Sequence, residues 1–281
     1  MKLDPEQTGQ HRNDLAEALK ILRKASGLSG ERLAVRTGMS QSKVSRIENG
    51  RILPSVVDVE RILRALGVDR ATSEDLLGLT RVANTEYRDV RASVRQGLHH
   101  RQQELAALEA GAVRMRYFLP TLITGLLQTP EYMRAAMSPP VEPASGDVSK
   151  AIAIKLSRQA VLYNQSKKFD FLLTESAVRW QLCEPAVMSI QLDRLVSLSR
   201  LPNVRIGVIP LSERVAEGAY HTYVVYDERM VTIELFTGQL VLRDPKDAEH
   251  YRALYEFFSE QARWGDEGRQ LLTRISREFM Q

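Results

Sequence analysis

Gly38-Met-Ser-Gln-Ser-Lys-Val-Ser-Arg-Ile-Glu-Asn-Gly50 is the stretch of sequence that decides the fold of the amino-terminal quarter of the chain. Ala34 lies four residues before Gly38, and Val44 and Ile47 lie ten and thirteen residues after Ala34. Two helices that cross closely around a tight turn need a small residue at the crossing, a turn residue that tolerates positive φ, and apolar residues on the inner face of the second helix. All of these needs are met at the right spacing, so the sequence predicts a helix-turn-helix.

Apolar residues recur at helical spacing on both sides of this stretch, and glycines and polar residues separate the runs. Several short helices joined by tight polar turns make a compact, mainly α domain, which we place at residues 13–70. The polar residues 1–12 are expected to form a flexible arm. Residues 71–108 keep a partial helical period and carry many arginines, so we expect a helical connector there.

From residue 109 to the end, the pattern predicts a larger domain of the α+β class. Helices are expected at about 148–165, at about 186–200 and from Asp247 onward, and the proline-rich residues 138–146 predict a loop. A period of two with β-branched and aromatic residues predicts five strands, which are Phe169–Thr174, Val204–Ile209, Tyr220–Tyr226, Val231–Leu235 and Leu240–Leu242. The last three follow one another closely, so we expect a small, mostly antiparallel sheet of about five strands.

The composition of the 281 residues excludes several classes of protein. Apolar residues make up 43% and charged residues 26%, as in a soluble globular protein. No stretch approaches the roughly 18 uncharged apolar residues that a membrane-spanning helix needs, and the amino terminus lacks the apolar core of a secretory signal. The single cysteine, Cys183, excludes an internal disulfide. We therefore expect a cytoplasmic protein without a membrane partner.

The net charge of +4 is concentrated in the first seventy residues, which hold 13 Lys and Arg against 9 Asp and Glu. The rest of the chain carries equal numbers of each sign. A positive surplus in this quarter is expected if it faces the phosphates of DNA, which supply much of a protein's affinity. An excess of four charges also falls within the ordinary scatter of sequences, so the charge alone decides little.

Residues 13–67 resemble the Xre/Cro–repressor family of regulators. The family's pattern of Leu-Ala, Gly, Ser-Gln-Ser, Ser-Arg-Ile-Glu and Gly, followed by Pro, is present here through Pro54. The resemblance implies that the helix over residues 40–48 lies in the DNA major groove with its amino-terminal end toward the bases. It also implies that Glu48 has a structural role, as an ion pair with Arg23.

The side chains of this helix that are not needed for packing are candidates for DNA contact. Those pointing away from Val44 and Ile47 are expected to reach base edges, and they are Gln41, Ser42, Ser45 and Arg46. Glutamine suits adenine and arginine suits guanine, each through two hydrogen bonds. Those placed for phosphate contacts are Ser40 at the helix start, Lys43 and Arg51. The alternative for each of these residues is a solvated surface position.

The larger domain also carries a resemblance. Its distinctive segments, in order, are Leu119–Tyr132, Ser157–Gln159, Leu173–Ala177 and Arg205–Pro210. Residues 105–265 are similar to the domain that follows an Xre-type helix-turn-helix in a large actinobacterial regulator family, called Scr1-like or antitoxin-like. The resemblance implies regulation through contact with a small partner protein.

The sequence offers little support for catalysis. The histidines form no metal-binding HExxH or His/Cys cluster, and neither a phosphate-binding Gly-rich loop nor a G-x-S-x-G elbow is present. Cys183 follows Trp180 on an apolar segment and is interpreted as a core thiol. Glu175 and His221 can pair in space, but nothing in the sequence requires it. We therefore expect no enzyme activity, no cofactor and no metal.

Together these observations predict a nucleoid-associated regulator that binds a double-stranded DNA operator. We expect a homodimer, because one recognition helix reads only a few base pairs and two half-sites make a specific site. A small protein encoded nearby would set its activity through the C-terminal domain. The alternative is a one-component regulator whose C-terminal domain senses a small-molecule ligand, which calls for a large pocket with a few convergent polar groups.

Overall fold

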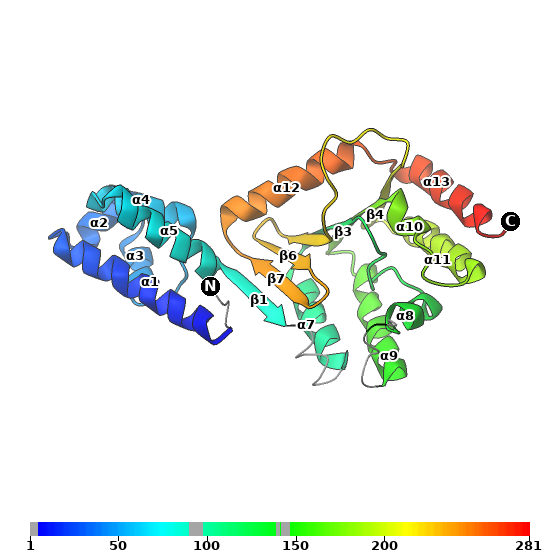
Figure 1. The fold of residues 1–281 in the computed structure, drawn as a ribbon, viewed down its shortest axis with the longest axis horizontal. Helices are drawn as coiled ribbons and strands as arrows, with labels where there is room; N and C mark the ends of the chain where they lie inside the picture. The colour runs from blue at the N-terminus through cyan, green and yellow to red at the C-terminus, as the bar shows by residue number, and fades with distance from the viewer. Residues whose placement is uncertain (1–4, 90–97, 139–140, 142–146) are drawn as a thin grey trace. The chain divides into compact units, whose positions relative to one another are not determined.

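The chain forms two compact units in the computed structural model (Figure 1). The residues whose structure is described are 5–89, 98–138, 141 and 147–281, with side chains described in these ranges except at 5–11, 89 and 98–104. Unit 1 consists of Met1–Arg88 and Leu240–Ala248, and unit 2 of Asp89–Gln239 and Glu249–Gln281. A short segment near the end of the chain therefore belongs to the amino-terminal unit.

Unit 1 is a bundle of helices around one apolar core. Its helices are α1 (Pro5–Ala25), α2 (Gly30–Thr37), α3 (Gln41–Glu48), α4 (Val56–Leu66) and α5 (Arg70–Asn84). Their buried apolar residues meet in one cluster, formed by Leu15, Leu19, Leu33, Ala34, Val44, Ile47, Val59, Ile62 and Leu63. The helix α1 begins at Pro5, so residues 5–12, expected as an arm, extend this helix. Once the later turns of α1 are packed, adding polar residues to an existing helix needs no new nucleus.

Residues 71–108 were expected to form a helical connector, and the structure divides them differently. The helix α5 ends at Asn84, whose side-chain amide donates to the carbonyl of Pro54 at 3.0 Å. Strand β1 (Thr85–Asp89) follows, and α7 (Leu98–Gly111) comes after residues outside the description. The residues of β1 are mostly polar and show no alternation, which is why the sequence pattern did not reveal this strand.

Unit 2 is an α/β domain, although most of the last strand given below and the start of the helix that follows it lie in the segment Leu240–Ala248, which belongs to unit 1. The remaining strands of the sheet are β2 (Arg114–Leu119), β3 (Lys168–Thr174), β4 (Val204–Ile209), β5 (Tyr223–Tyr226), β6 (Met230–Glu234) and β7 (Gly238–Leu242). The helices are α8 (Pro130–Ala136), α9 (Val148–Arg158), the 3-10 helix η1 (Gln159–Tyr163), α10 (Glu175–Arg179), α11 (Pro185–Leu198), α12 (Pro245–Glu260) and α13 (Gly265–Glu278). The predicted loop over residues 138–146 lies largely outside the described residues.

Among the described residues the sheet has seven strands in the order β1-β7-β6-β5-β2-β3-β4, and it is mixed. Strand β2 pairs in parallel with β3, and β3 in parallel with β4, whereas β5 is antiparallel to both β2 and β6. Tyr117 of β2 therefore lies opposite Phe171 on one side and Val224 on the other. Parallel neighbours need long crossover connections, and α8, α9 and η1 lie in the connection from β2 to β3.

The expectation of about five mostly antiparallel strands is therefore wrong. It missed β1 and also β2, which lies between the parallel and the antiparallel parts of the sheet. Within β2 the arginines 114 and 116 alternate with Met115 and Tyr117, and the two charges interrupt the apolar pattern of this short strand. The antiparallel pairing of β5 with β6 is confirmed.

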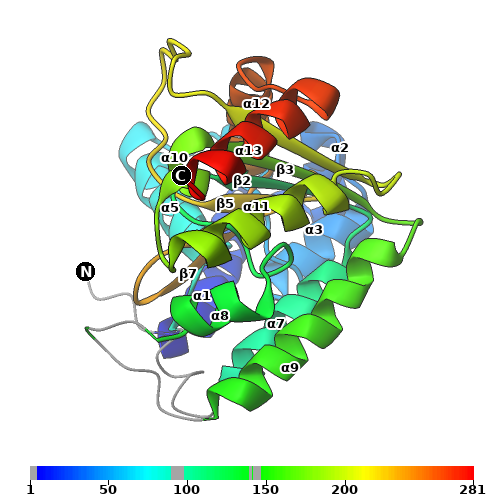
Figure 2. The same cartoon turned by 90° about the vertical axis from the view of Figure 1, so that its right-hand side faces the viewer.

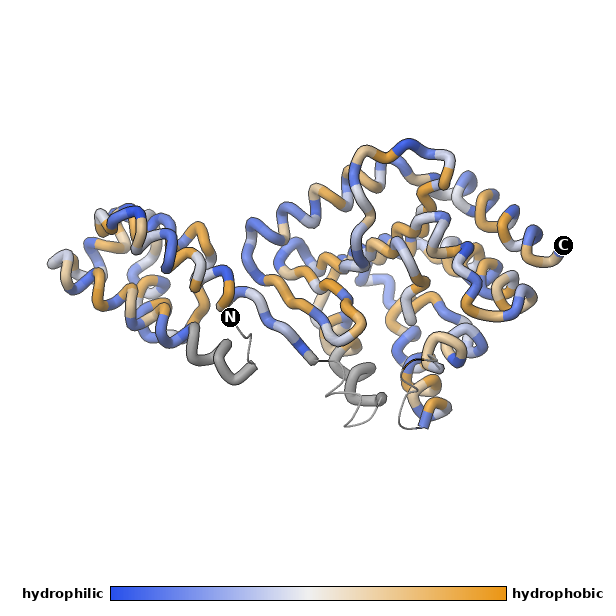
Figure 3. Tube along the Cα trace, in the orientation of Figure 1, coloured by the Kyte–Doolittle hydropathy of each residue, from blue (hydrophilic) through white to orange (hydrophobic). Residues whose placement is uncertain are grey.

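The two faces of the sheet carry different side chains. On one face Tyr117 stacks with Phe171 at 4.7 Å in the largest core, which α8, α11 and α13 cover (Figure 2). On the other face Phe118 stacks on Phe258 of α12 at 4.4 Å. Figure 3 shows hydrophobic and hydrophilic residues alternating along α12 and α13, as expected for helices with one buried face.

Candidate nucleic-acid interface

The turn between α2 and α3 has the geometry that a helix-turn-helix requires. Gly38 adopts a left-handed conformation with φ of 66°, and the amide of Met39 donates to the carbonyl of Ala34 at 3.0 Å. This conformation strains residues that carry a Cβ, which explains the glycine. Ala34, Val44 and Ile47 are all buried in the core of unit 1. The predicted helix-turn-helix geometry is confirmed.

Helix α3 divides its side chains between core and solvent. It starts at the N-cap Ser40, whose hydroxyl accepts a hydrogen bond from the amide of Lys43 at 3.2 Å. Four residues of α3 face outward as predicted for base contacts, with Gln41, Ser42 and Arg46 exposed and Ser45 half-buried. Their burial is compatible with base contact, and base contact itself stays a prediction.

Among the described residues, the guanidinium of Arg46 on this outer face makes one long hydrogen bond, whereas Ser45 has a closer partner. The Nε of Arg46 donates to the carbonyl of Ser42 at 3.4 Å, and the side-chain amide of Asn49 donates to the carbonyl of Ser45 at 2.8 Å. The guanidinium of Arg46 therefore keeps most of its donors for another partner. A side chain in this state can turn toward a base edge at small cost.

The ion pair that the resemblance implied between α1 and α3 is confirmed. Arg23 donates through Nε to Oε1 of Glu48 at 2.6 Å and through Nη2 to Oε2 at 2.8 Å. Its third nitrogen donates to the carbonyl of Leu28 at 2.8 Å. The hydrogen bonds that Arg23 donates to the carboxylate of Glu48 raise the pKa of Arg23 above its usual value. The pair fixes α3 against α1, so Glu48 has a structural role in the unit.

The three residues predicted for phosphate contacts stand in different situations. Ser40 and Arg51 are exposed, and the hydroxyl of Ser40 is engaged in the cap described above. The ammonium of Lys43 lies 2.7 Å from Oδ1 of Asp58, an acidic residue in the first turn of α4. Lys43 therefore already ties α3 to α4, and a phosphate would have to share it with Asp58.

Two acidic residues that shape the interface were missed from the sequence. Asp58 forms a capping box with Ser55, a signal that the spacing of three residues could have shown. Asp244 is 2% exposed, and its Oδ2 accepts a hydrogen bond at 2.7 Å from the amide of Val56 at the start of α4. The two partners lie 188 residues apart, so no local pattern could have revealed this contact.

Further pairs connect the segment Leu240–Ala248 with the helices of unit 1. Lys246 lies 3.0 Å from Glu60 of α4, and Arg243 lies 2.8 Å from Glu86 of β1. The amide of Lys246 also donates to Oδ1 of Asp244 at 2.9 Å, which holds that carboxylate in place. The segment is therefore part of the framework that carries the recognition helix.

The possible pairing of Glu175 with His221 is not formed. Glu175 binds Arg179 at 2.6 Å and accepts from the amide of Leu211, whereas Nε2 of His221 lies 3.0 Å from the hydroxyl of Tyr251. Within the described ranges no group of three His, Cys, Asp or Glu residues is placed to hold a metal ion. In the same ranges, no helix has the length and apolar character needed to cross a membrane.

Two family models match the chain. A helix-turn-helix domain model matches residues 14–76, which contain the α2–α3 geometry. A model described as a domain of unknown function, DUF5753, matches residues 102–274, more than half of the chain. The chain belongs to the DUF5753 family. The helix-turn-helix domain indicates that this DUF5753 protein binds DNA, and the finer identity that the sequence resemblance suggested for the larger domain is not shown.

None of the curated proteins matches the DUF5753 chain. Solved structures that the chain matches include Nuc, a phospholipase D family member from Salmonella typhimurium, at 11% identity and a TM-score of 0.33 over 59% of this chain and 90% of Nuc. NucT from Helicobacter pylori matches at 13% identity and a TM-score of 0.34, over 63% of this chain and 96% of NucT. TrmBL2, an archaeal chromatin protein, matches at 11% identity and a TM-score of 0.33, over 73% of this chain and 66% of TrmBL2. At these low scores the likenesses assign no function.

Proposed function

We propose that this protein is a sequence-specific transcriptional regulator that places α3 in the major groove of its operator. The observation that carries the proposal is the α2–α3 geometry, with Gly38 in the turn and with Gln41, Ser42 and Arg46 exposed on one face. An exposed helix of this kind fits the width of the major groove. The match to a helix-turn-helix domain supports the same assignment.

The proposal assigns base contacts to Gln41, Ser42, Ser45 and Arg46 and phosphate contacts to Ser40, Lys43 and Arg51. Arg46 is matched to guanine and Gln41 to adenine, because each side chain can form two hydrogen bonds to that base. The amides at the start of α3 face a phosphate, which the positive end of the helix dipole favours. Lys43 supplies a positive charge to the phosphate backbone of the DNA, and its ion pair with Asp58 also ties α3 to α4.

The proposal includes a homodimer on an operator with two half-sites, since a single eight-residue helix covers only a few base pairs. It assigns to unit 2 the binding of a small partner protein and no catalytic step. Support for the partner is the resemblance of residues 105–265 to antitoxin-like regulatory domains. Large apolar side chains that are exposed on unit 2 offer contact area, and they include Trp180, Leu211, Tyr220 and Phe236.

Selection of binding sites from random double-stranded DNA tests the central proposal. The full-length protein is expected to enrich one inverted repeat whose half-sites have a guanine at the position that Arg46 reads. An Arg46→Ala variant should enrich sites that no longer prefer that guanine. Recovery of DNA without any common sequence would contradict sequence-specific binding.

Co-purification with the product of the neighbouring small reading frame tests the partner. A stoichiometric complex that changes operator affinity is the expected result. If the regulator is recovered alone and its affinity does not respond to that product, the one-component alternative with a small-molecule ligand takes precedence.

A further inference from the structure

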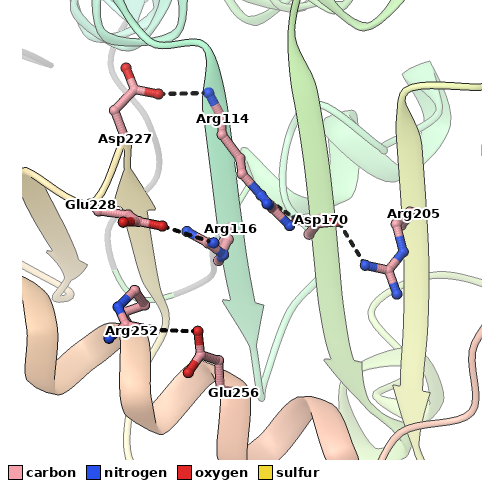
Figure 4. A network of polar contacts seen from close by, with 8 residues as sticks. All are labelled: Arg114, Arg116, Asp170, Arg205, Asp227, Glu228, Arg252 and Glu256. Carbon is pink, nitrogen blue, oxygen red and sulfur yellow. Dashed lines mark hydrogen bonds and ion pairs between the residues drawn. The ribbon is translucent and has the colours of Figure 1, made fainter.

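Five charged residues from three neighbouring strands lie together on the face of the sheet that also carries Phe118. The register places Arg116 opposite Asp170, Asp170 opposite Arg205, and Arg114 opposite Lys168. Paired residues of adjacent strands point to the same side of a sheet, and every second residue of a strand returns to that side. The cluster therefore consists of four cations and one acid, Asp170 of β3. Figure 4 shows Asp170 between Arg114 and Arg205, with Arg116 on the same strand as Arg114.

Asp170 organises two of the arginines. Its carboxylate is buried, with Oδ2 accepting from Nε of Arg114 at 3.1 Å and from Nη2 at 2.8 Å. Its Oδ1 lies 3.5 Å from Nη1 of Arg205. The side chains of Arg114 and Arg205 are 41% and 59% exposed. Each guanidinium uses only part of its donors on Asp170, so the remaining donors are open to another partner.

The side chain of Trp264 also holds Arg205 in place. Its guanidinium lies 4.7 Å from the ring centre of Trp264, a cation–π arrangement. The indole fits only because residue 207 is a glycine, since a Cβ there would lie 2.6 Å from the ring. The indole nitrogen donates to the carbonyl of Ser259 at 2.9 Å, which holds the ring. The arginine is therefore preorganised, which lowers the entropy lost when it binds a ligand.

A cavity of about 400 Å³ opens at this cluster. Arg114, Lys168 and Arg205 line it together with Asp170, so three cations face one acid. Gln165 and Asn203 add amide groups to the lining. A recess with this surplus of positive charge and planar guanidinium groups suits a small anion whose oxygens can take two hydrogen bonds from one arginine.

Two buried polar groups beside Asp170 have no hydrogen-bond partner among the described residues. Arg116 is 7% exposed and reaches Glu228 at 3.1 Å through Nη2, while its Nη1 has no acceptor. The hydroxyl of Tyr255 is also buried without a partner, and the charges of Asp170, Arg205 and Arg116 act on it. Buried donors without acceptors are rare in folded proteins and often mark a functional site.

We propose that this cluster is a binding site for the oxyanion group, phosphate or carboxylate, of a small molecule. The ligand's oxygens would accept hydrogen bonds from the remaining donors of Arg114 and Arg205, and Lys168 would supply a third positive charge. Asp170 positions the arginines and does not contact the ligand. The site lies within unit 2 and does not depend on DNA binding. If no anion binds there, the proposal that the protein is a DNA-binding regulator is unaffected.

Direct binding to the full-length protein tests the proposal, by calorimetry and by thermal unfolding, with pyrophosphate, inorganic phosphate and citrate as probes. Sodium chloride at equal ionic strength is the reference. At least one probe should bind at millimolar concentration or below and raise the unfolding midpoint by about 2 °C or more. Binding of the two phosphates in preference to citrate would identify a phosphate ligand, and the reverse would identify a carboxylate ligand. An equal rise with sodium chloride would overturn the proposal.

Variants separate the site from general attraction of anions. Arg205→Gln should weaken probe binding about tenfold or more, because a charge-assisted hydrogen bond is lost. Lys168→Gln, at an exposed position on the cavity rim, should weaken it without disturbing Trp264. Arg274→Gln is the matched control, since that side chain is 67% exposed on α13 and its nearest acid is 3.9 Å away. Unchanged binding in both site variants, or an equal loss in the control, would refute the site.

Discussion

At the scale of the residue, Arg46 has the clearest role to test. It is exposed on α3, and its one side-chain hydrogen bond among the described residues goes to the carbonyl of Ser42 at 3.4 Å. Glu48, two positions further on, is instead buried and bound to Arg23 through both carboxylate oxygens. Neighbouring charged residues of one helix therefore have opposite roles, because the helix turns successive side chains toward different surroundings.

Arg46→Ala is expected to weaken operator binding by about 1–3 kcal/mol and to relax the sequence preference at one position, since two hydrogen bonds to a base are lost. Titrations on operator and unrelated DNA measure both effects. Lys43→Ala should weaken binding to both DNAs alike, because a phosphate contact carries no sequence information. The control is Arg64→Ala, an exposed arginine of α4. Operator affinity unchanged by Arg46→Ala would remove the base contact.

Glu109 of α7 predicts a dependence of stability on pH. It is 3% exposed, with Arg158 of α9 at 3.2 Å. Burial raises the pKa of its carboxyl to about 7 from 4.5, although Arg158 opposes the shift. The folded state therefore holds the proton more tightly than the unfolded state. The stability from this group is full below about pH 4.5 and is lost as pH rises through about 7.

The loss of stability amounts to at most about 3.4 kcal/mol between the two limits. Urea unfolding of the wild type and of Glu109→Gln at a series of pH values measures it. The difference in stability between the two proteins should change over that interval in favour of the variant as pH rises, and other carboxylates cancel in the difference. A difference independent of pH would show that Glu109 titrates normally in the folded protein.

At the scale of the element, the amino terminus of α4 shows how distant parts of the chain support the recognition helix. Asp58 caps this helix with Ser55 and also binds Lys43 of α3, while Asp244 accepts from the amide of Val56. Negative charge is favourable at a helix amino terminus. Two carboxylates thus meet there, one local and one from the segment before α12.

Asp244→Ala is expected to destabilise unit 1 by about 1–3 kcal/mol, because the buried amide of Val56 loses its acceptor. Thermal unfolding of the full chain measures the stability, and operator titration measures whether α3 is also affected. Glu60→Ala is a suitable control: it removes the partly exposed pair with Lys246 and should change stability by less than about 1 kcal/mol. Equal effects of the two substitutions would argue against a special role for Asp244.

At the scale of the whole molecule, the proposed homodimer makes a geometric prediction about the operator. The two recognition helices of a dimer enter the major groove on one face of DNA, so the half-sites should be about one helical turn apart. Inserting about five base pairs between them turns one half-site to the opposite face and should abolish high-affinity binding, and about ten should restore part of it. Gel-shift titration distinguishes these DNAs. Affinity that does not respond to spacing would favour a monomer.

The sequence by itself determined the helix-turn-helix, because its requirements fall within one short stretch from Ala34 to Ile47. A small residue, a glycine with positive φ and two inward apolar residues act over local distances, so their spacing is readable from the chain. The buried and the exposed face of α3 could be predicted in the same way, from the helical spacing of Val44 and Ile47. Most strands of the larger domain were also found, because alternation of apolar residues is a local signal as well.

Only the tertiary structure decided the rest. The order of the mixed sheet depends on which distant strands pair, and β2 was missed because two arginines interrupt its apolar residues. The contact of Asp244 with Val56 joins residues 188 apart in sequence. The cluster around Asp170 exists because parallel pairing brings three separate strands into register. Such contacts depend on the path of the whole chain, which local spacing does not encode.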